Sequence, residues 1–372
     1  MKIAIDARMY LESGIGRYIR NLISGLQDLD NQNEYFILLR KKEFDTLSFK
    51  DNLHKILADF NWYSLTEQIK LPKLLNNLKV DLVHFPHFNV PIFYSGKFVV
   101  TIHDLIHQHF SMKRATTLNP LTYKLKQFSY KKIFKNAVSK SEKILVPSVY
   151  VKDLLVNEWS VKEDKIVVTP EAVDDRIFRV EKKMTTKKIK TVLNKFLIKR
   201  QYIFYVGNAH PHKNVEGLIK AFLKLKEKQD DLFLVLSGGD HYFWQRIKKE
   251  YNQKDIIYTG FISDEELTAL YKNAKVFVMP SYEEGFGIPL LEAMAVGCPV
   301  VSSNVGSLME VGGEAAIYFN PSDQMDIVNK ISQVLNDEIL KKSLIEKGQK
   351  RVKLFSWDKL AQQTLEVYSK CG

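Results

Sequence analysis

The chain has 372 residues, of which 45% are hydrophobic and 26% charged, and this balance excludes a disordered or low-complexity protein. Only two cysteines occur, Cys298 and Cys371, which argues against a disulfide framework and favours a reducing compartment. Residues 1–200 carry 35 Lys+Arg against 21 Asp+Glu, whereas residues 201–372 carry 20 against 22. We therefore expect the first half to face something anionic, such as nucleic acid, a lipid surface or a phosphorylated substrate.

The amino terminus, MKIAIDAR, has one lysine followed by a short strand pattern, with no long apolar core and no small-residue cleavage site. This pattern does not fit a signal peptide. No apolar run approaches the roughly 18 residues that a transmembrane helix needs. The sequence thus predicts a cytoplasmic protein.

The first half alternates between short apolar strands and helical patterns. The segment 2–7 is a predicted strand and 14–26 has apolar residues at helical spacing. Further strands are predicted at 35–39, 81–85, 97–104 and 143–148. Such an alternation predicts a parallel sheet that is covered on both faces.

The second half repeats this organisation. Strands are predicted at 202–207, 232–239, 255–260, 275–281 and 299–303, and a helix at 215–228. The fold class is therefore α/β, with two doubly wound, Rossmann-like domains. We predict an amino-terminal domain over 1–180, a lysine-rich linker over 181–200 and a second domain over 201–356.

The segment 281–301, SYEEGFGIPLLEAMAVGCPVV, follows a predicted strand, where doubly wound sheets bind their ligands. Gly285 and Gly287 let backbone approach a ligand closely. The helix that follows begins near Pro289 and offers unpaired N–H groups to a phosphate. Glu284 and Glu292 then remain to accept hydrogen bonds from hydroxyls. The combination predicts a nucleotide-sugar site, and the alternative is a capped helix with two surface acids.

Two other loops follow strands. In 205–214, YVGNAHPHKN, Lys213 stands at a predicted helix start, beside any bound diphosphate, although a solvated lysine is an alternative. In 11–21, LESGIGRYIRN, Gly14 and Gly16 open a helix and Arg17 adds a charge. Because the full G-x-G-x-x-G pattern is absent, this loop is weak evidence for a dinucleotide.

A histidine, His103, ends the strand in FVVTIHD, where it can bond a sugar hydroxyl or move a proton. Asp104, His107 and His109 follow closely, so a metal site is an alternative.

The segment 119–143 has seven lysines and one glutamate. Asn119 can cap a helix, and Pro120 suits its first position. A basic amphipathic helix with aromatic residues is typical of a membrane-surface element. The alternative is a helix packed on the first domain with a solvated lysine face. No RNA or DNA motif occurs, so no nucleic-acid partner is predicted.

The motifs resemble those of the retaining glycosyltransferases of family 4, which have the GT-B fold, and in particular a mannosyl-transferring branch. They fall in family order along nearly the whole chain: SGIGRYIRNL, TIHDL, ILVPSVYVKDLL, YVGN with HKN, TGFISDEELTALY, and PSYEEGFGIPLLEAMAVGCPVVSSNVGSLMEV. The resemblance implies an interdomain cleft and a carboxyl-terminal helix, 357–372, that crosses back to domain one.

The resemblance also implies the roles of individual residues. Glu284, His103 and Lys213 are the expected catalytic set, with Lys213 on the diphosphate and His103 near the reacting carbon. The other expected donor contacts are Gly16, Asn208, Phe261, Gly285, Phe286, Gly287 and Glu292, of which Glu292 binds the ribose. Two positions depart from the family pattern. Asn208 stands where an arginine is common, and PEAVD, 170–174, replaces the turn Asn-Gly-Val-Asp.

These implications predict retaining transfer of a hexose, first of all mannose from GDP-mannose, to a glycan acceptor. The acceptor is expected to be a lipid-linked polysaccharide or O-antigen precursor at the inner face of the cytoplasmic membrane. No metal and no separate cofactor are expected. The alternatives are a nucleotide-sugar epimerase, a non-catalytic nucleotide-sugar-binding protein and, on the histidine cluster, a metal-dependent hydrolase.

Overall fold

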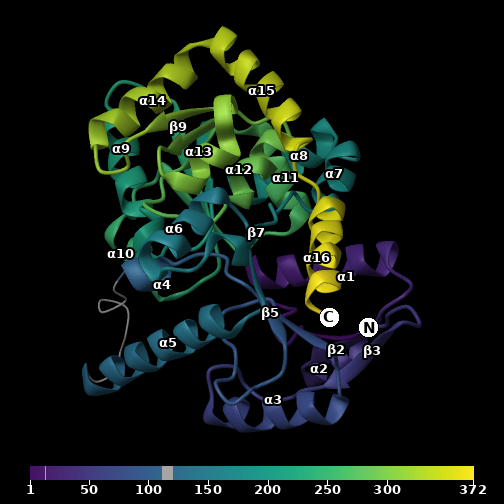
Figure 1. Ribbon diagram of the computed structural model, residues 1–372. Helices are drawn as coiled ribbons and strands as arrows, with labels where there is room; N and C mark the ends of the chain where they lie inside the picture. The colour runs from purple at the N-terminus through teal and green to yellow at the C-terminus, as the bar shows by residue number, and fades with distance from the viewer. Residues whose placement is uncertain (13, 111–119) are drawn as a thin grey trace. The chain divides into compact units, whose positions relative to one another are not determined.

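The computed structural model describes residues 1–12, 14–110 and 120–372 (Figure 1). It divides into two compact units. Within the described residues, unit 1 comprises Met1–Leu105, Thr116–Glu171 and Ser356–Gly372. Unit 2 comprises Ile106–Ala115 and Ala172–Phe355. Each unit contains its own parallel sheet with helices, so the predicted α/β class with two doubly wound domains is confirmed.

The sheet of unit 1 has the strand order β3-β2-β1-β4-β5-β6-β7, and every pairing is parallel. Its strands are β1 (Lys2–Asp6), β2 (Glu34–Leu39), β3 (Leu53–Leu57), β4 (Leu82–Phe85), β5 (Phe98–Thr101), β6 (Lys143–Val146) and β7 (Ile166–Val168). Its helices are α1 (Gly14–Leu29), α2 (Lys41–Thr46), α3 (Leu65–Leu78), α5 (Pro120–Lys140), α6 (Val149–Trp159) and α16 (Trp357–Cys371), with a 3₁₀ turn at Glu163–Lys165.

The last helix, α16, lies beside α1 in unit 1, which confirms its predicted return to the first domain (Figure 1). The close approach depends on Gly25, because a Cβ there would lie 2.6 Å from Cβ of Ala361. A buried chain of hydrogen bonds also holds the helix. Tyr368 Oη lies 2.6 Å from Nδ1 of His84, whose Nε2 lies 2.8 Å from the hydroxyl of Thr101. Burial lowers the pKa of His84 to about 3, so this link is neutral at physiological pH.

The sheet of unit 2 has the order β10-β9-β8-β11-β12-β13, again with parallel pairings. Its strands are β8 (Gln201–Val206), β9 (Leu232–Ser237), β10 (Ile256–Gly260), β11 (Val276–Met279), β12 (Val300–Ser303) and β13 (Ala316–Phe319). Its helices are α4 (Ile106–His109), α7 (Asp175–Lys182), α8 (Thr186–Lys195), α9 (Val215–Lys226), α10 (Tyr242–Glu250), α11 (Asp264–Asn273), α12 (Ile288–Ala295), α13 (Gly306–Gly312), α14 (Gln324–Asn336) and α15 (Glu338–Val352), with 3₁₀ turns at Pro211–Lys213 and Gly313–Ala315.

Apolar side chains cover both faces of this second sheet. Along β8, Tyr202 and Phe204 belong to one buried cluster, while Ile203 and Tyr205 belong to the other. Successive residues of a strand point to opposite faces, so an unbroken apolar strand indicates burial on both sides.

Each sheet has one switch point, where the strand order changes direction. It lies between β1 and β4 in unit 1 and between β8 and β11 in unit 2. Ligands of doubly wound folds bind at the carboxyl ends of the strands at these positions. The loops after these four strands are therefore the ones in which to look for chemistry.

The predicted linker, 181–200, instead contains the end of α7 and all of α8. Its apolar positions, Ile189, Val192 and Leu193, pack against the core of unit 2, and Ile198 is buried there as well. The lysines fill the remaining, solvent-facing positions of an amphipathic helix, which is why the composition alone resembles that of a linker.

The boundary between the units also shows how the charged residues are divided between them. Unit 1 has 25 Lys+Arg against 20 Asp+Glu, and unit 2 has 30 against 23. Ten of the basic residues counted in the first half of the sequence lie in 172–200, which belongs to unit 2. Both units are thus net positive, and the excess of basic residues in the first half of the sequence does not belong to unit 1 alone.

Helix α5 begins at Pro120, as expected for proline at the first helical position, while Asn119 lies outside the described residues. Phe134, Ala137 and Val138 are buried in unit 1. Lys131, Lys132, Lys135 and Lys140 are exposed. Phe128 does not share the buried side of Phe134, since its side chain is 67% exposed.

Among the helices of the described residues, none combines the length and the apolar character that crossing a bilayer requires.

Candidate active site

The loop between β11 and α12 forms the centre of the candidate site in unit 2. Strand β11 is fully buried and ends at Met279, and the helix begins at Ile288. Gly287 caps the helix with φ +108°, and a Cβ there would lie 2.5 Å from Cδ2 of Leu308. Only glycine adopts this backbone conformation without strain. The fold itself therefore requires this glycine, whether or not the backbone also contacts a ligand.

Glu284 is 7% exposed and is held by several polar groups. Lys213 Nζ lies 2.7 and 2.8 Å from its two carboxylate oxygens. Ser281 donates its hydroxyl to Oε1 at 2.6 Å, and Ser307 donates to the Glu284 carbonyl at 2.7 Å. The carboxylate is thus fixed in a defined orientation before any ligand arrives. Lys213 and Glu284, predicted separately from two loops, are brought together.

The loop after β8 positions Lys213. It ends a 3₁₀ turn, Pro211–Lys213, and Asn214 then takes the left-handed conformation before α9 starts. The amide of Asn214 donates to the Pro321 carbonyl at 3.0 Å. The backbone N–H of Tyr282 donates to the carbonyl of His212 at 2.7 Å and so joins the two loops. The Lys213–Glu284 pair consequently spans the switch point between β8 and β11.

The neighbouring Glu283 is also buried, and His109 Nδ1 lies 2.7 and 2.9 Å from its carboxylate oxygens. Sequence reasoning considered His109 only as a metal ligand and did not select Glu283 at all. Phe110, the next residue, stacks on the ring of Tyr282. The short helix α4 is therefore attached to the loop that carries Glu284.

Two other predicted donor contacts, Phe286 on this loop and Glu292 on α12, have side chains that are packed inside unit 2. The side chain of Phe286 is 5% exposed and meets Phe355 edge to face, so only its backbone remains to contact a ligand. Glu292 is 2% exposed, and the Tyr271 hydroxyl lies 3.4 Å from its Oε2. Glu292 therefore lies inside the unit at α12, and its expected bond to a ribose stays a prediction.

Asn208 and Phe261 occupy exposed positions at the ends of β8 and β10. Asn208 accepts a hydrogen bond at its carbonyl from the Tyr205 hydroxyl at 2.6 Å, and its Oδ1 accepts from the His210 N–H at 3.2 Å. It thus shapes the turn that leads to Lys213. The side chain of Phe261 is 87% exposed, directly after Gly260 with φ +73°.

Two predicted residues belong to unit 1. Gly16 is buried in α1, where a Cβ would lie 2.6 Å from the Tyr10 carbonyl oxygen, so the preceding loop requires glycine at this place. His103 follows β5, and its Nδ1 lies 3.0 Å from Oε1 of Glu171, while its Nε2 lies 3.0 Å from the carbonyl of Pro86. Their expected contacts with a donor stay predictions.

The partner of His103 decides its charge. Burial lowers the pKa of His103, but the hydrogen bond and the charge of Glu171 outweigh burial and raise this pKa above 6.5. When the ring is protonated, both nitrogens donate, one to the Glu171 carboxylate and one to the Pro86 carbonyl. Sequence reasoning missed Glu171, although it noted that PEAVD departs from the family turn. The acid in that departure is the signal that could have identified it.

The metal alternative finds no support in these contacts. His103 is engaged by Glu171 and Pro86, and His109 by Glu283. Within 1–12, 14–110 and 120–372, no three or more His, Cys, Asp or Glu side chains are grouped so that they can hold a metal ion.

Comparison with known families decides the classification. The family described as Glycosyltransferase Family 4 matches residues 13–176, and the one described as Glycosyl transferases group 1 matches residues 188–351. The O-antigen chain mannosyltransferase B of Escherichia coli is 32% identical over 301 residues, which cover 79% of this chain and 75% of that protein. The chain belongs to the family 4 glycosyltransferases. The resemblance stated from the sequence motifs is thereby confirmed, and the chain is a glycosyltransferase.

Another relative is much longer than this chain. The serotype-specific mannosyltransferase WbdA of Escherichia coli is 29% identical over 305 residues, which cover 77% of this chain but 35% of that protein. The chain therefore spans about a third of the length of this relative.

Solved structures confirm the GT-B fold. A glycosyltransferase from Rickettsia africae ESF-5 aligns with a TM-score of 0.76 and 21% identity, covering 100% of this chain and 98% of that one. The Anabaena protein HepE, solved in complex with UDP and glucose, aligns with a TM-score of 0.71 and 16% identity, over 99% of each chain.

Proposed function

We propose that this glycosyltransferase moves a mannosyl residue from GDP-mannose to a hydroxyl of a glycan acceptor, with retention at the anomeric carbon. The observation that carries the proposal is the Lys213–Glu284 pair at the switch point of unit 2. This pair of a cation and a carboxylate supports binding of a diphosphate by Lys213 and of sugar hydroxyls by Glu284. The choice of mannose follows the names of the relatives, two of which are O-antigen and serotype-specific mannosyltransferases.

The two charged residues divide the work on the donor. An ammonium group has three N–H donors, so Lys213 can keep Glu284 and still donate to a diphosphate oxygen. Glu284 has further lone pairs for hydroxyls of the transferred sugar. Charge that develops on the leaving diphosphate is stabilised by Lys213 and by the amino end of α12. We therefore propose a reaction that needs no metal, and predict that chelation leaves the transfer rate unchanged.

Retention is proposed to follow a front-face course. The acceptor oxygen bonds to the anomeric carbon while the bond from that carbon to the diphosphate oxygen breaks. The acceptor proton passes to the leaving diphosphate oxygen. No carboxylate is assigned as a nucleophile, because Glu284 is already fixed by Lys213 and Ser281. Isolation of a covalent glycosyl-enzyme adduct would overturn this course.

The donor is tested by thermal unfolding with GDP-mannose, UDP-glucose, UDP-galactose and GDP. A ligand at about 100 times its dissociation constant stabilises a protein by about 2.7 kcal/mol. We expect GDP-mannose to raise the melting temperature of the wild type and not that of Glu292→Ala. Glu346→Ala, an exposed glutamate on α15, is the matched control and should respond like the wild type. A response to UDP sugars alone would replace the base in the proposal.

Product analysis separates the remaining alternatives. An epimerase converts GDP-mannose into another sugar nucleotide without any acceptor, and a binding protein shows the thermal shift without turnover. A glycosyltransferase releases GDP in step with the appearance of a glycosylated acceptor.

We further propose a lipid-linked acceptor at an anionic membrane surface, approached through α5. Lys131, Lys132 and Lys135 are exposed on that helix, and each basic residue near an anionic surface contributes about 1 kcal/mol. Replacing all three by glutamine should abolish binding to vesicles that contain phosphatidylglycerol. The control replaces three exposed lysines of unit 2, Lys342, Lys350 and Lys353. Equal binding by both variants would reject the membrane role.

A further inference from the structure

The residues His109 and Phe110 contact both of the loops that carry the Lys213–Glu284 pair. In sequence they follow β5 of unit 1, but in the structure they belong to unit 2. His109 is the last residue of α4 and reaches the loop between β11 and α12. Phe110 reaches that loop and also the loop between β8 and α9. Two adjacent residues thus connect the segments that meet at the switch point of unit 2.

The contact of His109 is a hydrogen-bonded pair with Glu283. Nδ1 of His109 lies 2.7 and 2.9 Å from the two carboxylate oxygens, and the side chain of Glu283 is 8% exposed. A carboxylate that has lost most of its water needs hydrogen-bond donors inside the protein. Glu283 directly precedes Glu284, so the pair with His109 also holds the backbone from which Glu284 extends.

The contact of Phe110 is made by its ring. The ring centre lies 6.5 Å from that of Tyr282, at an interplanar angle of 24°, and 5.9 Å from that of His212, at 55°. Both distances are in the range of attractive aromatic pairs. Burial lowers the pKa of His212 to about 3, so its ring is neutral at physiological pH. Because the backbones of Tyr282 and His212 share the 2.7 Å hydrogen bond between the two loops, Phe110 packs on both residues that join these loops.

The contacted side chains stand next to the charged pair in the chain, since Glu283 and His212 each directly precede one member of it. We propose that His109 and Phe110 are positioning residues, which hold the two loops in the arrangement that binds the nucleotide-sugar donor. Neither residue is assigned a contact with the donor or with the reacting atoms. This proposal rests on the proposed function, since it names the residues that order the proposed donor site.

The proposal predicts a specific effect on donor binding. A loop that is already ordered loses little conformational freedom when a ligand arrives, whereas a loose loop must be ordered at the expense of affinity. Without the contact of His109 or of Phe110, the two loops should open more often in the free protein. The donor should then bind more weakly.

The test compares His109→Leu and Phe110→Ala with the wild-type full chain in two measurements. Hydrogen exchange, followed by mass spectrometry, reports opening of the segment 280–287 in the absence of any ligand. We expect this segment to exchange about tenfold faster in His109→Leu, as expected when a hydrogen bond to a charged group is lost. Isothermal titration calorimetry should give a dissociation constant for GDP-mannose that is about five- to tenfold higher in both variants.

A conservative variant distinguishes positioning from general damage to the fold. His109→Asn keeps an N–H donor close to the position of Nδ1 and should bind GDP-mannose within about twofold of the wild type. Equal loss of affinity in His109→Asn and His109→Leu would show that the hydrogen bond to Glu283 is not the cause.

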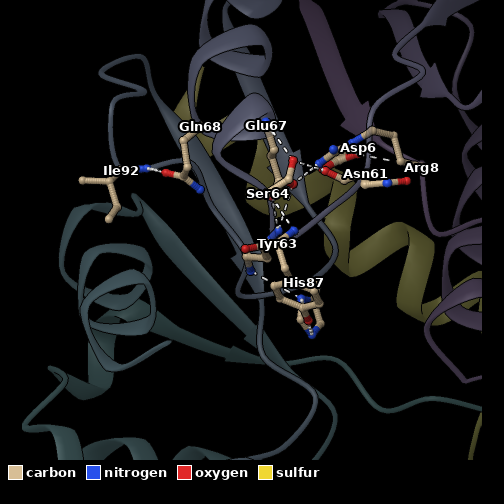
Figure 2. Close-up of polar contacts among 10 residues, drawn as sticks. Asp6, Arg8, Asn61, Tyr63, Ser64, Glu67, Gln68, His87 and Ile92 are labelled. Carbon is tan, nitrogen blue, oxygen red and sulfur yellow. Dashed lines mark hydrogen bonds and ion pairs between the residues drawn. The ribbon is translucent and has the colours of Figure 1, made fainter. Parts of the chain in front are cut away.

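A second control uses a buried network of unit 1. Figure 2 shows Arg8 with Asp6 and Glu67, to which its Nη2 donates at 2.7 and 2.6 Å. The amide nitrogen of Asn89 donates to both carboxylate oxygens of Glu67 at 2.8 Å. Asn89→Ala removes these two bonds and should lower the melting temperature. It should leave the exchange of 280–287 and the affinity for GDP-mannose unchanged, because the network belongs to unit 1 and both loops belong to unit 2.

Unchanged exchange of 280–287 in His109→Leu would overturn the proposal. Binding of GDP-mannose within about twofold of the wild type in both His109→Leu and Phe110→Ala would also overturn it, even if exchange were faster. The exchange measurement needs no donor. A wild-type chain that fails to bind GDP-mannose would therefore disprove the proposed donor, and the exchange result alone would then decide whether these residues hold the loops.

Discussion

Each switch point has an ion pair between a basic side chain and a carboxylate, and the two pairs differ in their exposure to solvent. In unit 1, Arg8 forms ion pairs with Asp6 and Glu67, and the side chains of Arg8 and Glu67 are 2% and 0% exposed. In unit 2, the side chains of Lys213 and Glu284 are 17% and 8% exposed. The first pair is a rigid part of the fold, while the second keeps partial access to solvent.

The difference indicates which charges are available for chemistry. A guanidinium locked by two carboxylates is an organising element, because moving it would leave buried charges without partners. An ammonium on a flexible stem that reaches solvent can turn toward a phosphate at little cost. The ion pairs at the switch point of unit 1 therefore stabilise the fold, and only the pair of unit 2 is accessible enough for the role that we propose for it on a diphosphate.

The largest effect on stability is expected from breaking the enclosed network. Glu67→Ala leaves Arg8 and Asn89 without a common partner, so the free energy of unfolding should fall by about 3–5 kcal/mol. Glu265→Ala is the matched control, since it also removes a first-turn glutamate, but from a half-exposed pair with Lys188. Its cost should be about 0–1 kcal/mol. Urea unfolding that gives the same cost for both variants would contradict the comparison.

At the switch point of unit 2, a substitution should lower kcat/KM for transfer more strongly than it lowers the free energy of unfolding. Lys213→Met should lower kcat/KM for the donor by about 10²–10³-fold, as does the loss of other groups that stabilise developing charge. Its cost in unfolding free energy should be about 1–3 kcal/mol, the cost of leaving one buried charged partner unsatisfied. Lys220→Met, on the exposed side of α9, controls for the loss of a lysine. Transfer within threefold of the wild type would remove Lys213 from the mechanism.

The loop that carries Glu284 should be sensitive to its backbone. Gly287→Ala forces a side chain into a positive φ and against Leu308, so we expect a loss of about 1–3 kcal/mol in unfolding free energy. Gly14→Ala is the control, because a Cβ at Gly14 meets nothing within 4 Å. The control should be neutral or slightly stabilising. Equal melting temperatures for the two variants would show that the loop relaxes around the added methyl group.

The smallest effect concerns His103, a titratable side chain of unit 1 that is paired with the carboxylate of Glu171. Its pKa is raised in the folded state, so its stabilising contribution is complete below the unfolded value of about 6.5 and is lost as pH rises through the folded value. Glu171→Gln should lower this pKa and reduce the loss of stability above neutral pH. An NMR titration of the ring measures the pKa, with the buried, neutral His84 as the internal reference, and urea unfolding at a series of pH values measures the stability. An unchanged His103 pKa would show that Glu171 does not control it.

The strands of the sheet interiors were predictable from sequence, whereas three edge strands were not. Sequence reasoning did not select β3, β7 or β13, and all three lie at sheet edges. In strand β3 only Leu53 is buried, and β7 has only three residues. An interior strand is covered on both faces and paired on both sides, which leaves a continuous apolar run in the sequence. An edge strand needs less apolar cover and so leaves a weaker signal.

The candidate site was predictable where one loop carries its own pattern. Glu284, Gly287 and Lys213 stand in strand–loop–helix segments whose residue types indicate their chemistry. Their supporting residues were not predictable. Ser307 and Glu171 reach Glu284 and His103 from segments that are 23 and 68 residues away in sequence. Asn89 was missed for the same reason, because its hydrogen-bond partner Glu67 lies on another element, α3.

The sequence by itself determined the repeated pattern of apolar strands and amphipathic helices, the loops that follow the strands, and the family. These features depend on local spacing, which is visible in any window of a few turns. Only the tertiary structure decided which residues meet. Parallel strands bring their carboxyl ends to one edge from distant parts of the chain, so the partners of Arg8, His103 and Glu284 depend on strand order. Strand order is a property of the whole sheet, and no single segment of the sequence contains it.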